Sequence, residues 1–218
     1  MTGMMALVTA AAFGQPFSAG VAGGVPGVGA LNSASPYFRA VTRPYVVGPV
    51  GELRLPRGFA IEAGALWRRL GYDFSYDLPS VSGTSIRGTG SASASMWEFP
   101  VLAKYRRPLE KMTPFLVLGP SFNRVTDMRL EGQLCSKGPF EANYRCGAMA
   151  VEDGWPELRH RGAIGITVGG GIESRCFPLR IAPGVRYTHW GERNFGTRGA
   201  DVSTRLNQVT FLIEVQLW

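Results

Sequence analysis

A histidine and a carboxylate near position 190 are the residues of this chain best suited to chemistry. His189 is one of two histidines, and Glu192 follows it closely. A histidine oriented by a carboxylate can act as the base that activates a nucleophile, as in acyl-transfer triads. A metal centre is not expected, because two histidines and three cysteines, spread along the chain, offer too few ligands in one place. No motif indicates a cofactor.

The segment that follows this pair is a clear β-strand. From Leu206 to Trp218, one set of alternate positions is apolar and the other mostly polar. The apolar set is Val209, Phe211, Ile213, Val215 and Leu217, and the polar set is Gln208, Thr210, Glu214 and Gln216. Successive side chains of a strand point to opposite faces, so this strand has one apolar and one polar face.

Similar alternation elsewhere predicts an all-β chain of eight strands. The expected strands cover residues 17–29, 45–55, 59–74, 96–107, 113–128, 162–173, 178–190 and 206–218. The expected long loops are 30–43, 75–94, 129–160 and 191–204, and the expected turns are 56–58, 108–112 and 174–177. Long and short connections alternate, which is typical of an antiparallel up-and-down transmembrane barrel with short periplasmic turns and long extracellular loops.

Charged residues recur on one face of these strands. They are Glu52, Glu62, Arg68, Glu98, Lys104, Glu173, Arg180, Arg186 and Glu214. The other face carries large apolar residues such as Trp67, Trp97 and Phe99. A soluble barrel that carries a ligand needs an apolar interior, so that class is a minor alternative, whereas a membrane barrel turns its apolar face to lipid.

The inward charges are expected to plug the barrel rather than line a pore. Eight strands leave an interior that side chains can fill. When residues are counted along the strands from the periplasmic turns, Glu62 lies at the height of Lys104 and Arg68 at the height of Glu98. The same count also places Arg180 near Glu173 and Glu214. We therefore expect a closed network of ion pairs.

The termini and cysteines suggest an exported protein. Residues 1–14 read as a signal peptide that lacks its basic start, so the true start codon is expected further upstream; an N-terminal strand or helix is the alternative. Residues 15–218 then form one barrel domain. Cys135 and Cys146 lie close together in a polar stretch and are expected to form a disulfide. The net charge of +7 is scattered, so nucleic acid is not an expected partner.

Several segments together resemble the bacterial outer-membrane β-barrel domain family. They are the run from Glu98 to Tyr105, Pro114 to Leu116, Gly169 to Gly171, and the terminal Trp218. The resemblance implies an eight-stranded barrel in the bacterial outer membrane, in contact with lipid and lipopolysaccharide. It also implies a C-terminal strand read by the barrel-assembly machinery, and no catalytic residue. A monomer is expected.

A second, fainter resemblance concerns His189. The run Arg186-Tyr187-Thr188-His189 is similar to a motif of lipid A deacylases, which are eight-stranded outer-membrane barrels. The resemblance implies a nucleophilic serine two residues after the histidine, where this chain has Gly191. Without the nucleophile, acyl transfer is not expected. The expected function is therefore envelope structure, or surface recognition and adhesion through the outer loops, with a lipid-modifying enzyme as the alternative.

Overall fold

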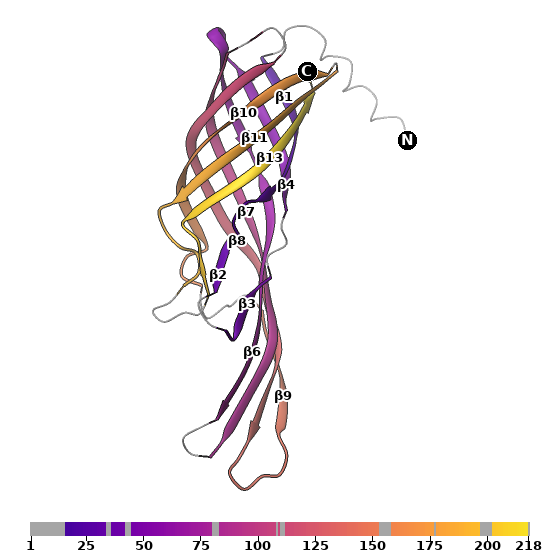
Figure 1. Ribbon diagram of the computed structural model, residues 1–218, viewed down its shortest axis with the longest axis vertical. Coiled ribbons are helices and arrows are strands. Elements are labelled where there is room, and N and C mark those ends of the chain that lie inside the picture. Colours follow the sequence, from indigo (N-terminus) through magenta and orange to yellow (C-terminus); the bar gives the residue numbers. More distant parts are fainter. Residues whose placement is uncertain are drawn as a thin grey trace.

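The computed structural model of the protein is a long β-barrel from which a sheet projects at one end (Figure 1). It describes residues 16–33, 36–41, 45–79, 83–107, 109, 112–152, 158–176, 178–196 and 202–217. The expected signal peptide and Trp218 lie outside these residues. No described helix is long and apolar enough to cross a membrane.

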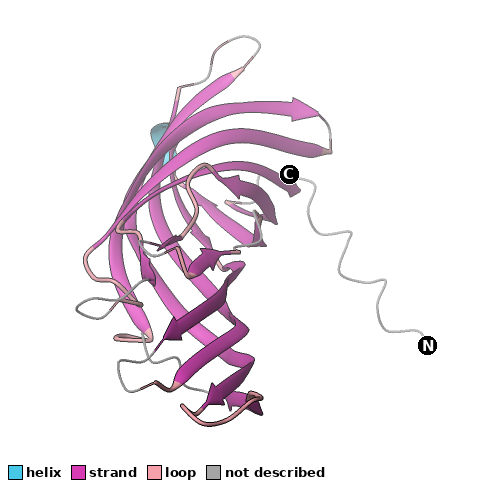
Figure 2. Ribbon diagram, turned by 60° about the horizontal axis from the view of Figure 1, so that its bottom comes forward, coloured by secondary structure: helices cyan, strands magenta, loops and turns pink. Residues whose placement is uncertain are grey.

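The barrel is closed, antiparallel and eight-stranded, which confirms the predicted fold class. Its wall consists of β1 (Phe17–Pro26), β4 (Val46–Arg54), β5 (Phe59–Gly64) continued by β6 (Leu66–Pro79), β7 (Ser85–Arg106), β8 (Thr113–Lys137), β10 (Gly162–Cys176), β11 (Leu179–Trp190) and β13 (Asn207–Leu217). Neighbours in the chain pair with one another, and β1 closes the ring against β13. Figure 2 shows the strands curving around the barrel axis.

Side-chain alternation explains why these segments form a barrel in lipid. Apolar residues of one parity lie on the outer surface; Leu116, Ile164 and Ile166 are each more than 60 % exposed. Charged and polar residues of the other parity are buried inside, among them Glu52 at 0 % and Lys104 at 1 %. A strand with one apolar and one polar face can satisfy both the membrane and the lumen.

The short turns lie at the barrel end opposite the projecting sheet. Residues Pro56–Gly58 make a tight 3-10 turn, as predicted. Arg57 and Gly58 both have positive φ values, of 63° and 82°. A Cβ at Gly58 would lie 2.5 Å from the carbonyl oxygen of Arg106, so glycine is required there.

Two of the predicted long loops are wrong, because strands continue through them. Residues 75–94 belong mostly to β6 and β7, and residues 129–160 contain the end of β8 and all of β9 (Arg145–Glu152). The continued strands form the projecting sheet, in the order β6, β7, β8 and β9. We call this part, beyond Asp73 on β6, the protruding sheet.

Glycines make room for aromatic rings in the protruding sheet. A Cβ built on Gly90 would lie 2.6 Å from the ring of Phe74, and one on Gly88 would lie 2.4 Å from the ring of Tyr76. The small residues of β7 thus leave space for the aromatic rings of β6. A Ser/Gly-rich composition, which predicted a loop, here belongs to a strand.

The other two long loops also contain short strands. Within residues 30–43 lie β2 (Leu31–Ser33) and β3 (Phe38–Ala40), and β12 (Val202–Thr204) lies within residues 191–204. β2 pairs with β12, and β3 adds to the side of β6. Residues 174–176 of the predicted turn 174–177 belong to β10, which continues to Cys176, and Phe177 lies outside the described residues.

A bulge marks where the protruding sheet leaves the barrel. The pairing of β7 and β8 shifts by one residue between Ser93 and Ser95. Asp127 has a positive φ of 51°, and its carboxylate accepts a hydrogen bond from Thr126, 3.0 Å long. Such an extra residue bends a strand and increases its twist.

Trypsin applied to intact cells should cleave the far end of the protruding sheet and spare the periplasmic turns. Lys137 ends β8 and Arg145 begins β9, so the loop between them carries accessible sites. Arg57 lies in a turn at the periplasmic end and should stay uncut until the outer membrane is permeabilised. Mass spectrometry of the released peptides tests this. Early cleavage at Arg57 in sealed cells would contradict the orientation.

Candidate functional site

Two rings of ion pairs occupy the inner half of the lumen. The first, which we call the periplasmic ring, consists of Glu52, Arg106, Glu173 and Arg180. Nε of Arg106 lies 2.8 Å from Glu173, and its guanidinium also contacts Glu52. Arg180 lies 2.9 Å from Glu52 and 3.2 Å from Glu173. Each arginine thus contacts both carboxylates, and Arg54 also lies 3.6 Å from Glu52.

The second ring, the middle ring, lies directly above the first. It consists of Glu62, Lys104, Arg186 and Glu214. Nζ of Lys104 lies 2.9 Å from Glu62 and 3.4 Å from Glu214. Arg186 contacts both carboxylates. Lys104 also lies 3.4 Å from Glu52, so it joins the two rings into one network.

A separate pair lies further outward, where Nη2 of Arg68 is 2.7 Å from the carboxylate of Glu98. The structure therefore brings Glu62 together with Lys104 and Arg68 together with Glu98, as their positions along the strands indicated. The partner predicted for Glu214 was wrong: Arg180 reaches Glu52 and Glu173, while Glu214 contacts Lys104 and Arg186. The reason is register, because Gln216 rather than Glu214 lies opposite Arg180.

The outer half of the lumen holds groups that sequence reasoning missed. A chain of hydroxyls joins Ser121 to Thr167 at 2.7 Å and Thr167 to Thr188 at 2.8 Å. Further outward the interior becomes apolar. Its buried residues include Leu31, Leu70, Met96, Val125, Met128, Phe195 and Val202. Leu31 and Val202 come from the paired strands β2 and β12, so these strands form an apolar cap over the barrel.

His189 and Glu192, the candidate catalytic residues, do not form a pair. Nδ1 of His189 lies 2.7 Å from the side-chain oxygen of Asn207 on the neighbouring strand. Glu192 lies 3.8 Å from Nε2 of His160. His189 is on β11 and points outward, whereas Glu192 follows the end of that strand. The proposed orientation of His189 by Glu192 is therefore wrong.

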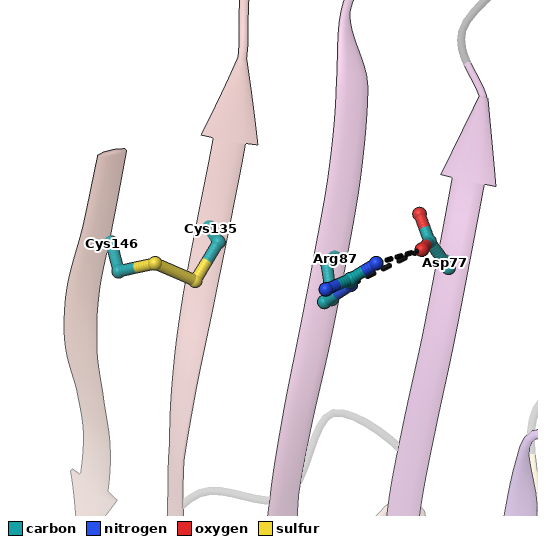
Figure 3. The surroundings of a disulfide bond; sticks show 4 residues. All are labelled: Asp77, Arg87, Cys135 and Cys146. Carbon is teal, nitrogen blue, oxygen red and sulfur yellow. Dashed lines mark hydrogen bonds and ion pairs between the residues drawn. A yellow bond between two sulfur atoms is a disulfide. The ribbon is translucent and has the colours of Figure 1, made fainter. Parts of the chain in front are cut away.

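The protruding sheet is reinforced by a row of cross-strand contacts (Figure 3). Asp77, Arg87, Cys135 and Cys146 lie opposite one another across β6, β7, β8 and β9. Cys135 and Cys146 form the predicted disulfide. Asp77 accepts two hydrogen bonds from Arg87, 2.5 and 3.1 Å long, and these raise the pKa of Arg87 above its usual value. Near the far end of the sheet, the ion pair thus joins β6 to β7 and the disulfide joins β8 to β9.

Comparison with known proteins agrees with this architecture. The family model described as outer membrane protein beta-barrel domain matches residues 13–191. The chain belongs to this family. The bacterial outer membrane is therefore its location. No curated protein matches the chain.

Two solved outer-membrane proteins are similar to this member of the family. Neisserial surface protein A is 11 % identical with a TM-score of 0.44, and the match covers 92 % of this chain and 95 % of that one. The attachment invasion locus protein of Yersinia pestis, in complex with the heparin analogue sucrose octasulfate, is 11 % identical with a TM-score of 0.39, covering 93 % and 99 %.

The disulfide leads to a test of which cysteines are bonded and which is free. Alkylation of denatured, unreduced protein should modify only Cys176, which is exposed and unbonded, whereas Cys135 and Cys146 should react only after reduction. The reason is that a disulfide sulfur is not a free thiolate. Peptide mapping by mass spectrometry gives the answer. Modification of Cys135 without reductant would exclude the bond in the exported protein.

Proposed function

We propose that this barrel is a non-enzymatic outer-membrane protein that recognises surfaces outside the cell through its protruding sheet. The observation that carries the proposal is the continuity of β6, β7, β8 and β9 beyond the barrel. β7 and β8 have 22 and 25 residues, although about 10 are enough to span the membrane. The surplus length is paired and cross-linked, which suits a rigid binding surface rather than a passive loop.

We propose in addition that the lumen does not conduct. The charges of both rings are paired and buried, and the apolar cap lies over them. Eight strands leave room for side chains but little more. The outer surface of the barrel contacts outer-membrane lipid and lipopolysaccharide, and β13 is the strand that the barrel-assembly machinery recognises.

A variant without the protruding sheet tests the recognition role. Phe74 lies opposite Gly90, and Glu131 lies opposite Ala150, so the sheet can be shortened in register. Residues 75–89 and residues 132–149 would each be replaced by Asn-Gly, a sequence that favours a two-residue hairpin turn. Bacteria that produce the full protein should adhere to cultured cell monolayers or to one another. Bacteria that produce the shortened protein should not.

Two measurements keep this test interpretable. Heat-modified gel mobility shows whether the shortened barrel still folds, and surface labelling shows that equal amounts reach the outer membrane. Adhesion that is unchanged in a folded, equally abundant short variant would exclude the protruding sheet as the recognition element.

A further inference from the structure

We propose that β9 is a homotypic contact strand, which pairs antiparallel with β9 of a second copy on a facing membrane. This inference rests on the proposed recognition function and names its partner. β9 is the last strand at its side of the sheet, and no described strand pairs with its other edge. In Figure 1 it runs along the long axis of the molecule, at the outer side of the protruding sheet.

The edge of β9 lacks the usual protection against pairing. Exposed edge strands normally carry charges or proline, which prevent another strand from adding to them. The opposite edge of the protruding sheet, beyond β3, has Asp77 and ends at Pro79. By contrast, β9 carries charges only at its two ends, Arg145 and Glu152, and the six residues between them, Cys146–Val151, contain neither a charge nor a proline. The two edges of one sheet therefore differ, and only the β9 edge is suited to accept a strand.

The disulfide shows which backbone groups face this open edge. The Cα atoms of Cys135 and Cys146 are 4.0 Å apart. Such a short separation is typical of an antiparallel pair whose N–H and C=O groups point away from each other. The backbone groups of Cys146 therefore point to the open edge, and by alternation so do those of Ala148 and Ala150.

Only some registers let two such edges pair. In a two-fold antiparallel pair, residues that point to the edge must face each other. Placing Ala148 opposite Ala148 of the second copy meets this condition. It also places Cys146 opposite Ala150, so up to six backbone hydrogen bonds can form.

This register is also complementary in side-chain size. It sets Gly147 of each copy opposite Met149 of the other, on the face that carries Leu134. A Cβ at Gly147 would have no heavy atom within 4 Å, so there is space for a long side chain beside it. Met149 is half-buried because it packs partly against the apolar cluster of its own molecule, and a methionine side chain is flexible enough to adapt to irregular space beside it. On the opposite face, Ala148 faces Ala148 and Ala150 faces Cys146, whose sulfur is held in the disulfide.

The direction of the strands decides where the second copy must lie. Two copies in one membrane have parallel long axes, so identical β9 strands would run in the same direction. Antiparallel pairing reverses one long axis, which places the two barrels at opposite ends of the joined sheets. The contact therefore connects two facing membranes.

Charge variants of Ala148 test this contact in reconstituted vesicles. Ala148 is exposed, and it would face its own copy across the two-fold axis. Two vesicle populations that carry the full protein and different lipid dyes should form double-labelled clusters. Ala148→Lys alone and Ala148→Glu alone should each reduce clustering at least about fivefold, because like charges directly opposite destabilise a strand pair. Mixing the lysine and glutamate vesicles should restore clustering.

Gln133 provides the matched control. It lies opposite Ala148 on β8, one strand away from the edge. Gln133→Lys and Gln133→Glu should each leave clustering unchanged. Equal loss in the Gln133 and Ala148 variants, no rescue in the mixture, or no clustering of the unmodified protein would each overturn the proposal. If the shortened protein abolishes adhesion to monolayers but Ala148→Lys retains full adhesion between cells, recognition stands and the β9 contact falls.

Discussion

Replacing Glu62 with alanine lowers the free energy of unfolding of the barrel by about 3–5 kcal/mol. Glu62 is 1 % exposed and accepts contacts from both cations of the middle ring, Lys104 and Arg186. Removing the carboxylate leaves two buried positive charges with one remaining acidic partner in that ring, Glu214. The cost is that of an uncompensated buried charge, which exceeds the value of the ion pair itself.

Urea titration of the purified protein in detergent, followed by tryptophan fluorescence and gel mobility, measures this loss. The double variant Glu62→Ala/Lys104→Ala removes one charge of each sign and leaves Arg186 with Glu214. Its destabilisation should be smaller than the sum of the two single variants, because the two residues are coupled. Asp77→Ala removes an exposed pair with Arg87 and should leave the unfolding free energy unchanged. Equal, additive losses at all these sites would argue against a cooperative lumen network.

Planar bilayers that contain the unmodified protein should show no steady single-channel current. Two different barriers lie in series along the lumen: the charged rings toward the periplasm and the apolar cap toward the outside. Opening one of them leaves the other closed. Removing the cap with Phe195→Ala and Val202→Ala should therefore still give a silent bilayer.

Current should appear only when both barriers are weakened. Adding Glu62→Ser and Lys104→Ser to the cap variant leaves the net charge of the lumen unchanged while it replaces two long side chains with small hydroxyls. We expect flickering conductance from this quadruple variant alone. Large, steady currents from the unmodified protein would show that the charges line an open pore.

Strand parity was enough to predict the barrel, because the membrane and the lumen impose opposite requirements on neighbouring residues. It correctly placed Glu62 and Lys104 inside, and it correctly placed Phe99 on the outer surface. The periodic signal was strong wherever apolar residues had to face lipid. The short turn Pro56–Gly58 was found for a local reason, since proline and glycine favour turns and Gly58 has a positive φ value.

The protruding sheet was missed because composition was given more weight than periodicity. Residues 75–94, rich in serine and glycine, predicted a loop, yet the alternation of Tyr72 and Phe74 with polar residues continues into this segment at Tyr76. Period-two alternation of aromatics was the signal that could have revealed it. The ion-pair partners in the lumen were only partly predictable. Strand pairing sets how far along the barrel axis each residue lies, but the tilt of a long side chain decides which charge it contacts. The pairing of β2 with β12 joins segments that are distant in the chain, and no local sequence pattern predicts it.

The continuity of β7 and β8 from the membrane to the far end of the sheet has a consequence for the entropy of binding. A flexible loop loses conformational freedom when a partner orders it, and that loss weakens the complex. Here the strands are already ordered when the barrel folds, and the Cys135–Cys146 bond keeps β9 aligned with β8. A partner therefore meets a surface that has little freedom left to lose, so even a modest contact area can support a lasting attachment.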